Sequence, residues 1–208
     1  MRYLALIMIL ATIGCSPDKS SSTHLPKLSA LIVERPPDAI LLEEIKNNRD
    51  QVNQLDWRGA TPLMYALGIH LNDPERMALQ ASVIKETKES PQIVETLLIS
   101  GADPNSVSRV TKVSPLLLAV NHGWLSSTEV LLRNGADPNL VVGDQTPLMI
   151  AAHRCYKDLA LVLLARGATP NYRNVANETA LMIAEKAKCQ SVSGILTSTL
   201  AQKVPGSN

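Results

Sequence analysis

The 208-residue sequence contains no phenylalanine, and aromatic residues make up only 3% of it. A hydrophobic core must therefore come from Leu, Ile, Val, Ala and Met, which suits thin, repetitive helix pairs. Neither sign of charge dominates, since 20 Lys and Arg residues stand against 19 Asp and Glu residues. Because a nearly neutral chain has no long-range field that attracts nucleic acid, we expect no nucleic-acid partner.

The N-terminal apolar run is too short to cross a bilayer. About eleven apolar residues follow Arg2 and end at Gly14-Cys15, whereas a spanning helix needs about 20. Residues 1–14 therefore predict a secretory signal peptide. The end of the run resembles the lipobox of bacterial lipoproteins, with Thr12 where that family usually has Leu. The resemblance implies lipidation of Cys15; an ordinary signal peptide and a short buried helix are the alternatives.

The residues that follow favour a tether at the outer membrane. Ser16, rather than Asp, comes after the cysteine. By its resemblance to the enterobacterial sorting pattern, this implies anchoring in the inner leaflet of the outer membrane, facing the periplasm. Ser, Pro and Lys are frequent up to Pro37, so we expect a flexible linker over 15–36. A flexible tail is expected over 201–208.

Two short motifs recur in phase along the rest of the chain. Gly-Ala-Asp-Pro-Asn at 101–105 returns at 135–139 and, with Thr for Asp, at 167–171, in steps of 34 and 32 residues. Thr-Pro-Leu-Met at 61–64 returns in related form at 114–117, 146–149 and 179–182. The pattern resembles the ankyrin repeat. The resemblance covers 37–200 and implies an all-α solenoid of stacked helix pairs with hairpin-like loops, which binds proteins and is not an enzyme.

The copy after Thr146 shows how one repeat should fold. Thr146 is placed to cap an inner helix whose first residue is Pro147. Cys155 takes the place of the glycine usual between the two helices, and an outer helix is predicted over 157–165. Leu148 and Leu163 should be buried, because one unit covers its apolar face only by stacking on others.

The first copy and the two ends depart from the pattern. The first copy carries about 19 extra residues, placed at 71–90. They favour helix and form either a neutral decoration or a protrusion that contacts a partner. Residues 39–46 predict an unpaired outer helix of a half repeat, and 191–200 predict a polar-faced terminal helix.

No motif of a hydrolase, kinase or dinucleotide-binding enzyme is present. His122 and His153 fall near the ends of consecutive inner helices, but no Cys, Asp or Glu stands beside them at metal-ligand spacing. The Asp of each Gly-Ala-Asp-Pro-Asn is placed to cap its own loop. We therefore expect no catalytic residues, no metal and no cofactor.

Cys155 and Cys189 stand nine and ten residues after Thr146 and Thr179. Export would place them in a compartment where disulfides persist. A disulfide needs Cα atoms within about 4.4–6.8 Å, while packed helices lie about 8–10 Å apart. Either the helix ends converge and a bridge forms, or the two thiols stay separate.

The resemblance implies two binding surfaces, the loop tips and the concave face of the inner helices. Basic residues surround apolar ones at these positions, which predicts a protein partner with an acidic surface; solvated turns without a partner are the alternative. The candidate residues are Trp57, Arg58, Arg109, Val110, Lys112, His122, Val142, His153, Arg154, Tyr172 and Arg173.

Together these features favour a non-enzymatic binding protein of the bacterial periplasm. Lipid-anchored periplasmic ankyrin proteins resemble immunity proteins that occlude toxins delivered by type VI secretion, phospholipases among them. A scaffold for an endogenous periplasmic or outer-membrane protein is the second hypothesis. A periplasmic enzyme or its accessory subunit is the third.

Overall fold

The computed structural model describes residues 26–34, 36–68 and 89–202. The predicted signal peptide, the predicted lipidation site at Cys15 and nearly all of the insertion at 71–90 lie outside these residues. The described part contains ten α-helices and the short 3-10 helix η1 (Arg49–Gln51), and one isolated bridge, between Val142 and Gln145, is its only β pairing. The helices are α2 (Lys27–Glu34), α3 (Asp38–Asn47), α4 (Pro62–Ala66), α6 (Pro91–Ile99), α7 (Pro115–His122), α8 (Leu125–Arg133), α9 (Pro147–Arg154), α10 (Lys157–Ala165), α11 (Ala180–Lys186) and α12 (Gln190–Gln202).

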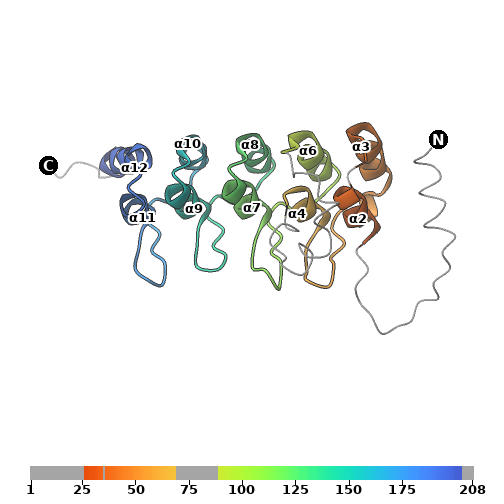
Figure 1. Ribbon diagram of the computed structural model, residues 1–208, viewed down its shortest axis with the longest axis horizontal. Helices are drawn as coiled ribbons and strands as arrows, with labels where there is room; N and C mark the ends of the chain where they lie inside the picture. Colours follow the sequence, from red (N-terminus) through yellow and green to blue (C-terminus); the bar gives the residue numbers. More distant parts are fainter. Residues whose placement is uncertain (1–25, 35, 69–88, 203–208) are drawn as a thin grey trace.

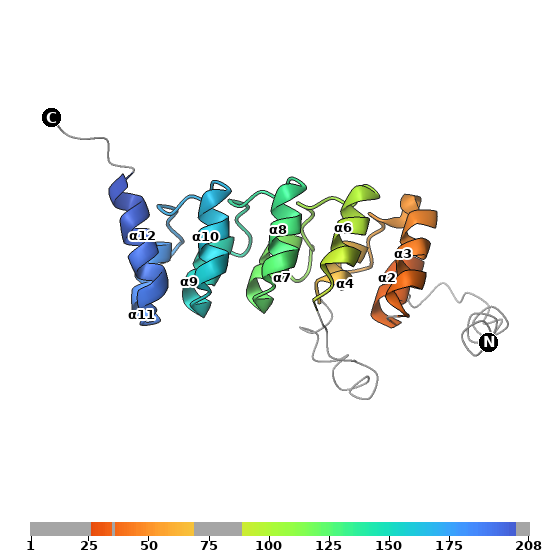
Figure 2. The same cartoon turned by 90° about the horizontal axis from the view of Figure 1, so that it is seen from above.

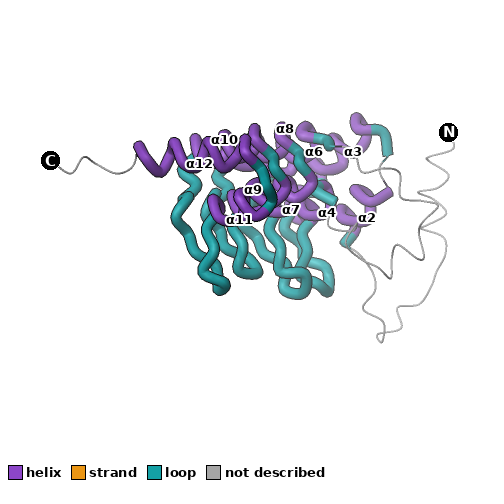
Figure 3. The backbone as a smooth tube through the Cα atoms, turned by 60° about the vertical axis from the view of Figure 1, so that its left-hand side comes forward, coloured by secondary structure: helices purple, strands orange, loops and turns teal. Residues whose placement is uncertain are grey.

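The helices form two layers of five (Figure 1). The inner layer holds α2, α4, α7, α9 and α11, and the outer layer holds α3, α6, α8, α10 and α12 (Figures 1 and 2). Long loops project from the inner layer on one side of the molecule (Figure 3). The chain is therefore the all-α solenoid of stacked helix pairs that the sequence predicts.

Four inner helices begin in the same way, as the recurring Thr-Pro-Leu motif predicts. The Oγ atoms of Thr61, Ser114, Thr146 and Thr179 accept a hydrogen bond from the backbone N–H three residues later, at 3.2–3.3 Å. Proline follows the first three caps, where its missing N–H is not needed. The cap predicted at Thr146 is confirmed.

The core runs along the whole stack and is made of aliphatic side chains. Leu148 and Leu163 are 1% and 0% exposed, as predicted. Val142 was predicted to be exposed on a tip, and that prediction is wrong, because only 7% of it is exposed. Val142 and Gln145 exchange backbone hydrogen bonds of 3.1 and 3.2 Å. This pairing turns the Val142 side chain inward, and the neighbouring Val141 is the exposed valine.

The N-terminal end is a complete helix pair, which corrects two predictions. Residues 27–34 belong to α2 rather than to a flexible linker, and α3 is not an unpaired helix because α2 is its partner. Leu28 and Ile32, one helical turn apart, are buried, and α2 packs on α4. The Ser- and Pro-rich composition concealed this short apolar stripe.

Three asparagines join neighbouring repeats by the same pair of hydrogen bonds, which we call the asparagine clasp. Asn53 donates from Nδ2 to Gly101 O (2.7 Å) and accepts at Oδ1 from Asp103 N (2.8 Å). Asn105 binds Gly135 O and Asp137 N, and Asn139 binds Gly167 O and Thr169 N, in the same way. The carboxylates of Asp103 and Asp137 accept from the backbone N–H two residues later at 2.8 Å, so the predicted loop caps are confirmed.

Cys155 and Cys189 form a disulfide, with their Cα atoms 5.5 Å apart. Cys155 has φ 60°, in the left-handed position that Gly123 occupies with φ 77° one repeat earlier. Cys189 instead matches Tyr156, because each donates its N–H to the carbonyl five residues before it. The two cysteines therefore occupy adjacent positions of the repeat. A Cβ atom at Gly123 would likewise lie only 3.0 Å from the Tyr156 ring.

Candidate protein-binding surface

The projecting loops end in four tips, formed by residues 56–60, 108–113, 141–145 and 174–178 (Figure 3). We call them tips 1 to 4. Each tip lies just before the inner helix that follows it, so the capping residues fix its position. Most of the candidate residues predicted from the sequence lie on the tips or at the far ends of the inner helices.

Tip 1 holds its acidic residue inside and its aromatic residue outside. Asp56 is buried, and its carboxylate accepts from Arg58 N (2.9 Å), Ala60 N (2.7 Å) and the Tyr65 hydroxyl (2.6 Å). Trp57 is 57% exposed, and the Arg58 guanidinium lies 4.6 Å from its ring centroid. Such stacking favours a single orientation of the exposed ring.

Tip 2 is attached directly to tip 1. The Arg58 carbonyl accepts from Arg109 N (3.0 Å), Val110 N (3.2 Å) and Ser108 Oγ (3.1 Å). Because the backbone is fixed in this way, the Arg109, Val110 and Lys112 side chains remain exposed. Tips 1 and 2 therefore form one continuous surface with an aromatic, an aliphatic and several cationic side chains.

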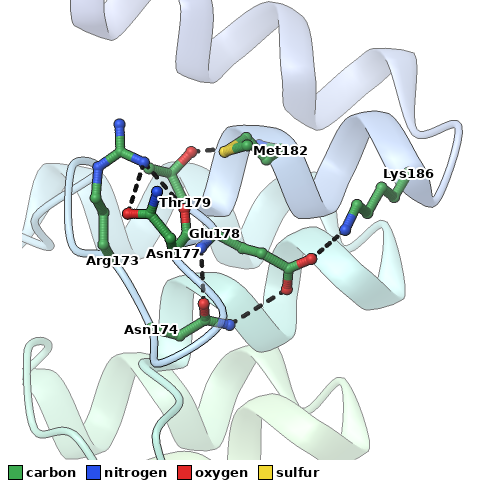
Figure 4. Close-up of polar contacts among 7 residues, drawn as sticks. All are labelled: Arg173, Asn174, Asn177, Glu178, Thr179, Met182 and Lys186. Atoms are coloured by element: carbon green, nitrogen blue, oxygen red, sulfur yellow. Dashed lines mark hydrogen bonds and ion pairs between the residues drawn. The ribbon is translucent and has the colours of Figure 1, made fainter.

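Tips 3 and 4 are joined by the second acidic residue of the tips. Both carboxylate oxygens of Asp144 accept from Val175 N, at 2.8 and 3.0 Å, and the Val175 side chain is 90% exposed. Arg173 donates from Nη1 to the carbonyl and side-chain oxygens of Asn177 (2.9 and 3.2 Å; Figure 4). Tyr172 is half-buried against the core, so its ring is less available to a partner than predicted.

The candidate residues at the inner-helix ends do not act alike. His122 stacks on Trp124 with ring centroids 4.9 Å apart; burial, with a further contribution from Arg154, lowers its pKa. Arg154 donates to Asn121 Oδ1 at 3.0 Å, while His153 is exposed. Within the described residues no three His, Cys, Asp or Glu side chains could hold a metal ion together.

A groove of about 290 Å³ separates α9 from α11 near tips 3 and 4. It is lined by Gln145, Met149, His153, Asn174, Glu178, Ile183, Lys186 and Ala187. Glu178 forms an ion pair with Lys186 and accepts from Asn174 Nδ2 at 3.3 Å (Figure 4). The hydrogen bond from Lys186, and then that from Asn174, lowers the pKa of Glu178.

Sequence reasoning missed most of this groove. Glu178 stands one residue before a helix cap and Lys186 seven after it, which are the positions of Gln145 and His153 in the preceding repeat. Aligning the last two repeats and noting opposite charges at the two positions would have revealed the pair. Nothing in the sequence shows that the lining is open rather than filled.

The repeats match a family model. Residues 81–174 match the model for ankyrin repeats, described as three copies. The stack has the fold of an ankyrin-repeat solenoid. Ankyrin repeats are a protein–protein interaction module. No described helix has the length and apolar character needed to cross a membrane.

Two curated relatives share part of the ankyrin region. An ankyrin repeat protein of fowlpox virus (strain NVSL) is 36% identical over 75 residues, which is 36% of this chain and 25% of that protein. The human oxysterol-binding protein-related protein 1 is 35% identical over 80 residues, which is 37% of this chain and 8% of that protein. The chain thus spans a quarter or less of either relative.

Proposed function

We propose that the ankyrin solenoid binds a protein with an acidic surface through its tips, without catalysing a reaction. One observation carries this proposal. All three tip carboxylates, those of Asp56, Asp144 and Glu178, accept hydrogen bonds or ion pairs from other groups of the protein. Trp57 on tip 1 and Arg109 and Lys112 on tip 2 are exposed to solvent.

The exposed tip residues have the composition of a binding hot spot. Tryptophan and arginine are the residue types most enriched where truncation weakens protein complexes. Trp57, Val110 and Val175 are 57%, 58% and 90% exposed, which gives apolar area beside the cations. Complementary charge would speed the encounter with an acidic partner and orient it.

We place this binding in the bacterial envelope. The apolar run that ends at Gly14-Cys15 supports export and a lipid anchor at Cys15, which would hold the solenoid at the inner leaflet of the outer membrane. The disulfide between Cys155 and Cys189 also fits an oxidising compartment. Replacing Cys15 by Ser should abolish palmitate labelling and release the protein from membranes.

Within the envelope, the function we propose is that of an immunity protein. The solenoid would cover the catalytic cleft of a periplasm-acting type VI secretion toxin, such as a phospholipase. A rigid basic and apolar surface suits stoichiometric occlusion, because tight inhibitory complexes depend on charge complementarity and few anchor residues. Cells that express the full chain should survive a periplasm-directed phospholipase toxin encoded beside it.

The binding surface is tested by reversing its charges in the full-length protein. Changing Arg109, Lys112 and Arg173 together to Glu should lower capture of the partner at least about tenfold, with circular dichroism unchanged. The matched control reverses Arg133 and Lys157, which are exposed on outer helices, and should bind normally. Loss of binding in the control but not in the tip variant would place the partner on the opposite face and refute the proposal.

A further inference from the structure

The groove between α9 and α11 is lined by both apolar and charged side chains. Ile183, which is half-buried, and Met149, which is 2% exposed, form the apolar lining from the two inner helices, and both belong to or pack on the hydrophobic core. His153 and Lys186 stand at the exposed ends of the same helices. The groove can therefore accept an aliphatic side chain while a charged group lies within reach.

Lys186 and Glu178 form an ion pair at the groove, but the two side chains are not equally accessible to a partner. Both carboxylate oxygens of Glu178 have a partner, since one binds Lys186 and the other accepts a hydrogen bond from Asn174. Asn174 also accepts from Glu178 N at 2.7 Å, which holds the glutamate in place (Figure 4). Lys186 has three donors, and its side chain is 69% exposed. A second carboxylate can therefore join Lys186, whereas a cation has less access to Glu178, whose side chain is only 22% exposed.

We infer that this groove is a subsite for a partner segment in which an aliphatic residue stands beside an aspartate or glutamate. The aliphatic side chain packs on Met149 and Ile183, and the carboxylate joins Lys186 on the side away from Glu178. Glu178 then acts as an internal competitor, because its charge repels the incoming carboxylate and neutralises part of Lys186. This inference rests on the proposed function, which supplies the acidic partner.

The subsite makes a directional prediction that a merely structural ion pair does not. Replacing Lys186 by Gln removes the attraction and should weaken binding of an acidic segment about two- to fivefold, the range expected for an exposed charge pair. Replacing Glu178 by Gln keeps the shape and removes the competitor, so it should strengthen binding by a similar factor. Lys157→Gln, on outer helix α10, is the matched control and should change nothing.

The experiment uses the full chain and two synthetic peptides, Ac-Gly-Ser-Leu-Asp-Gly-Ser-NH2 and its counterpart with Lys in place of Asp. Titrations followed by amide NMR give both the site and the affinity. The Leu-Asp peptide should shift the amides of Met149, His153 and Ile183, and should bind more tightly than the Leu-Lys peptide. Tighter binding of the Leu-Lys peptide, or amide shifts at other residues, would refute the proposed subsite. So would an affinity for the Leu-Asp peptide that is the same in the unaltered protein, Lys186→Gln and Glu178→Gln.

The outcome separates the subsite from the proposed function. If the peptides fail in the groove but reversal of the tip charges still abolishes capture of the partner, only the subsite is wrong. If reversal of the tip charges leaves capture unchanged, the proposed function is wrong whatever the peptides do.

Discussion

The last junction of the solenoid is closed differently from the first three. At each of the first three junctions an asparagine clasp ties the loop after one outer helix to the loop after the next. Asn171 occupies the same position in the third copy of the motif, but α12 is not followed by another such loop in the described chain. The α9–α12 junction carries the disulfide instead.

The difference shows how a repeat protein can join its last repeat to the preceding one where the recurring motif supplies no asparagine clasp. A clasp needs an asparagine in one repeat and a Gly-Ala-x-Pro-Asn loop in the next, so it is absent where no such loop follows. A disulfide needs only two Cα atoms at the right distance. The one-residue offset between Cys155 and Cys189 provides it, at the opposite end of the inner helices from the tips.

The largest expected effect is the loss of unfolding free energy when a core leucine is truncated. It can be compared between the middle of the stack and its end. Leu148→Ala should lower the free energy of unfolding by about 2–5 kcal/mol, because α9 is covered on both sides. Leu196→Ala, equally buried in α12, should cost about 2–3 kcal/mol, since α12 has a neighbour on one side only. Urea melts followed by circular dichroism measure both. A larger loss at Leu196 would mean that the end of the stack is packed more tightly than its middle.

Removing the disulfide tests whether it replaces the missing clasp. The double change Cys155→Ser and Cys189→Ser should cost about 3–4 kcal/mol, the loop-closure value for a separation of 34 residues. Hydrogen exchange should lose protection in α11 and α12 before the other helices. Reductant should have the same effect on the unaltered protein and none on the double variant. Uniform loss of protection along the whole stack would contradict this assignment.

The clasps themselves should be worth less than the bridge. Asn105→Ala removes two hydrogen bonds, to Gly135 O and from Asp137 N, and should cost about 1–2 kcal/mol. Asn171→Ala is its natural control and should cost less than about 0.5 kcal/mol, because no Gly-Ala-x-Pro-Asn loop follows α12 in the described chain. Equal costs at the two positions would show that the clasp contributes no stability.

The smallest effect concerns the ion pair at the terminal repeat. Glu178 has a lowered pKa in the folded protein, so its contribution is present at neutral pH and is lost as pH falls through that pKa. The difference in melting temperature between the protein and Glu178→Gln should therefore shrink from pH 7 into the acid range. High salt should reduce the same difference, because the pair is exposed. A difference that grows on acidification would contradict the assigned shift.

The sequence was enough to predict the repeats. It was less informative about features that the repeat motifs do not encode, such as the burial of individual loop side chains and the N-terminal helix. Caps at Thr146 and Thr179 follow from local hydrogen bonding, which a short motif encodes completely. Val142 was misplaced because its direction depends on a bridge to Gln145, and α2 was missed because its apolar stripe is only two turns long. The cationic residues of the tips could be identified from the sequence. The hydrogen bonds of the Asp56 and Asp144 carboxylates could not, because they depend on contacts with Tyr65 and Val175.

The bridge between Cys155 and Cys189 also sets the smallest piece of the solenoid that can come loose. Linear repeat arrays fray from their ends, one repeat at a time, because each repeat touches only its neighbours. Here α12 cannot leave without drawing the end of α9 with it, so the last two repeats must detach together. The fraying unit at the C-terminal end is thus doubled in size, and the whole of tip 4, with the groove residues from Asn174 to Ala187, lies inside a covalently closed ring.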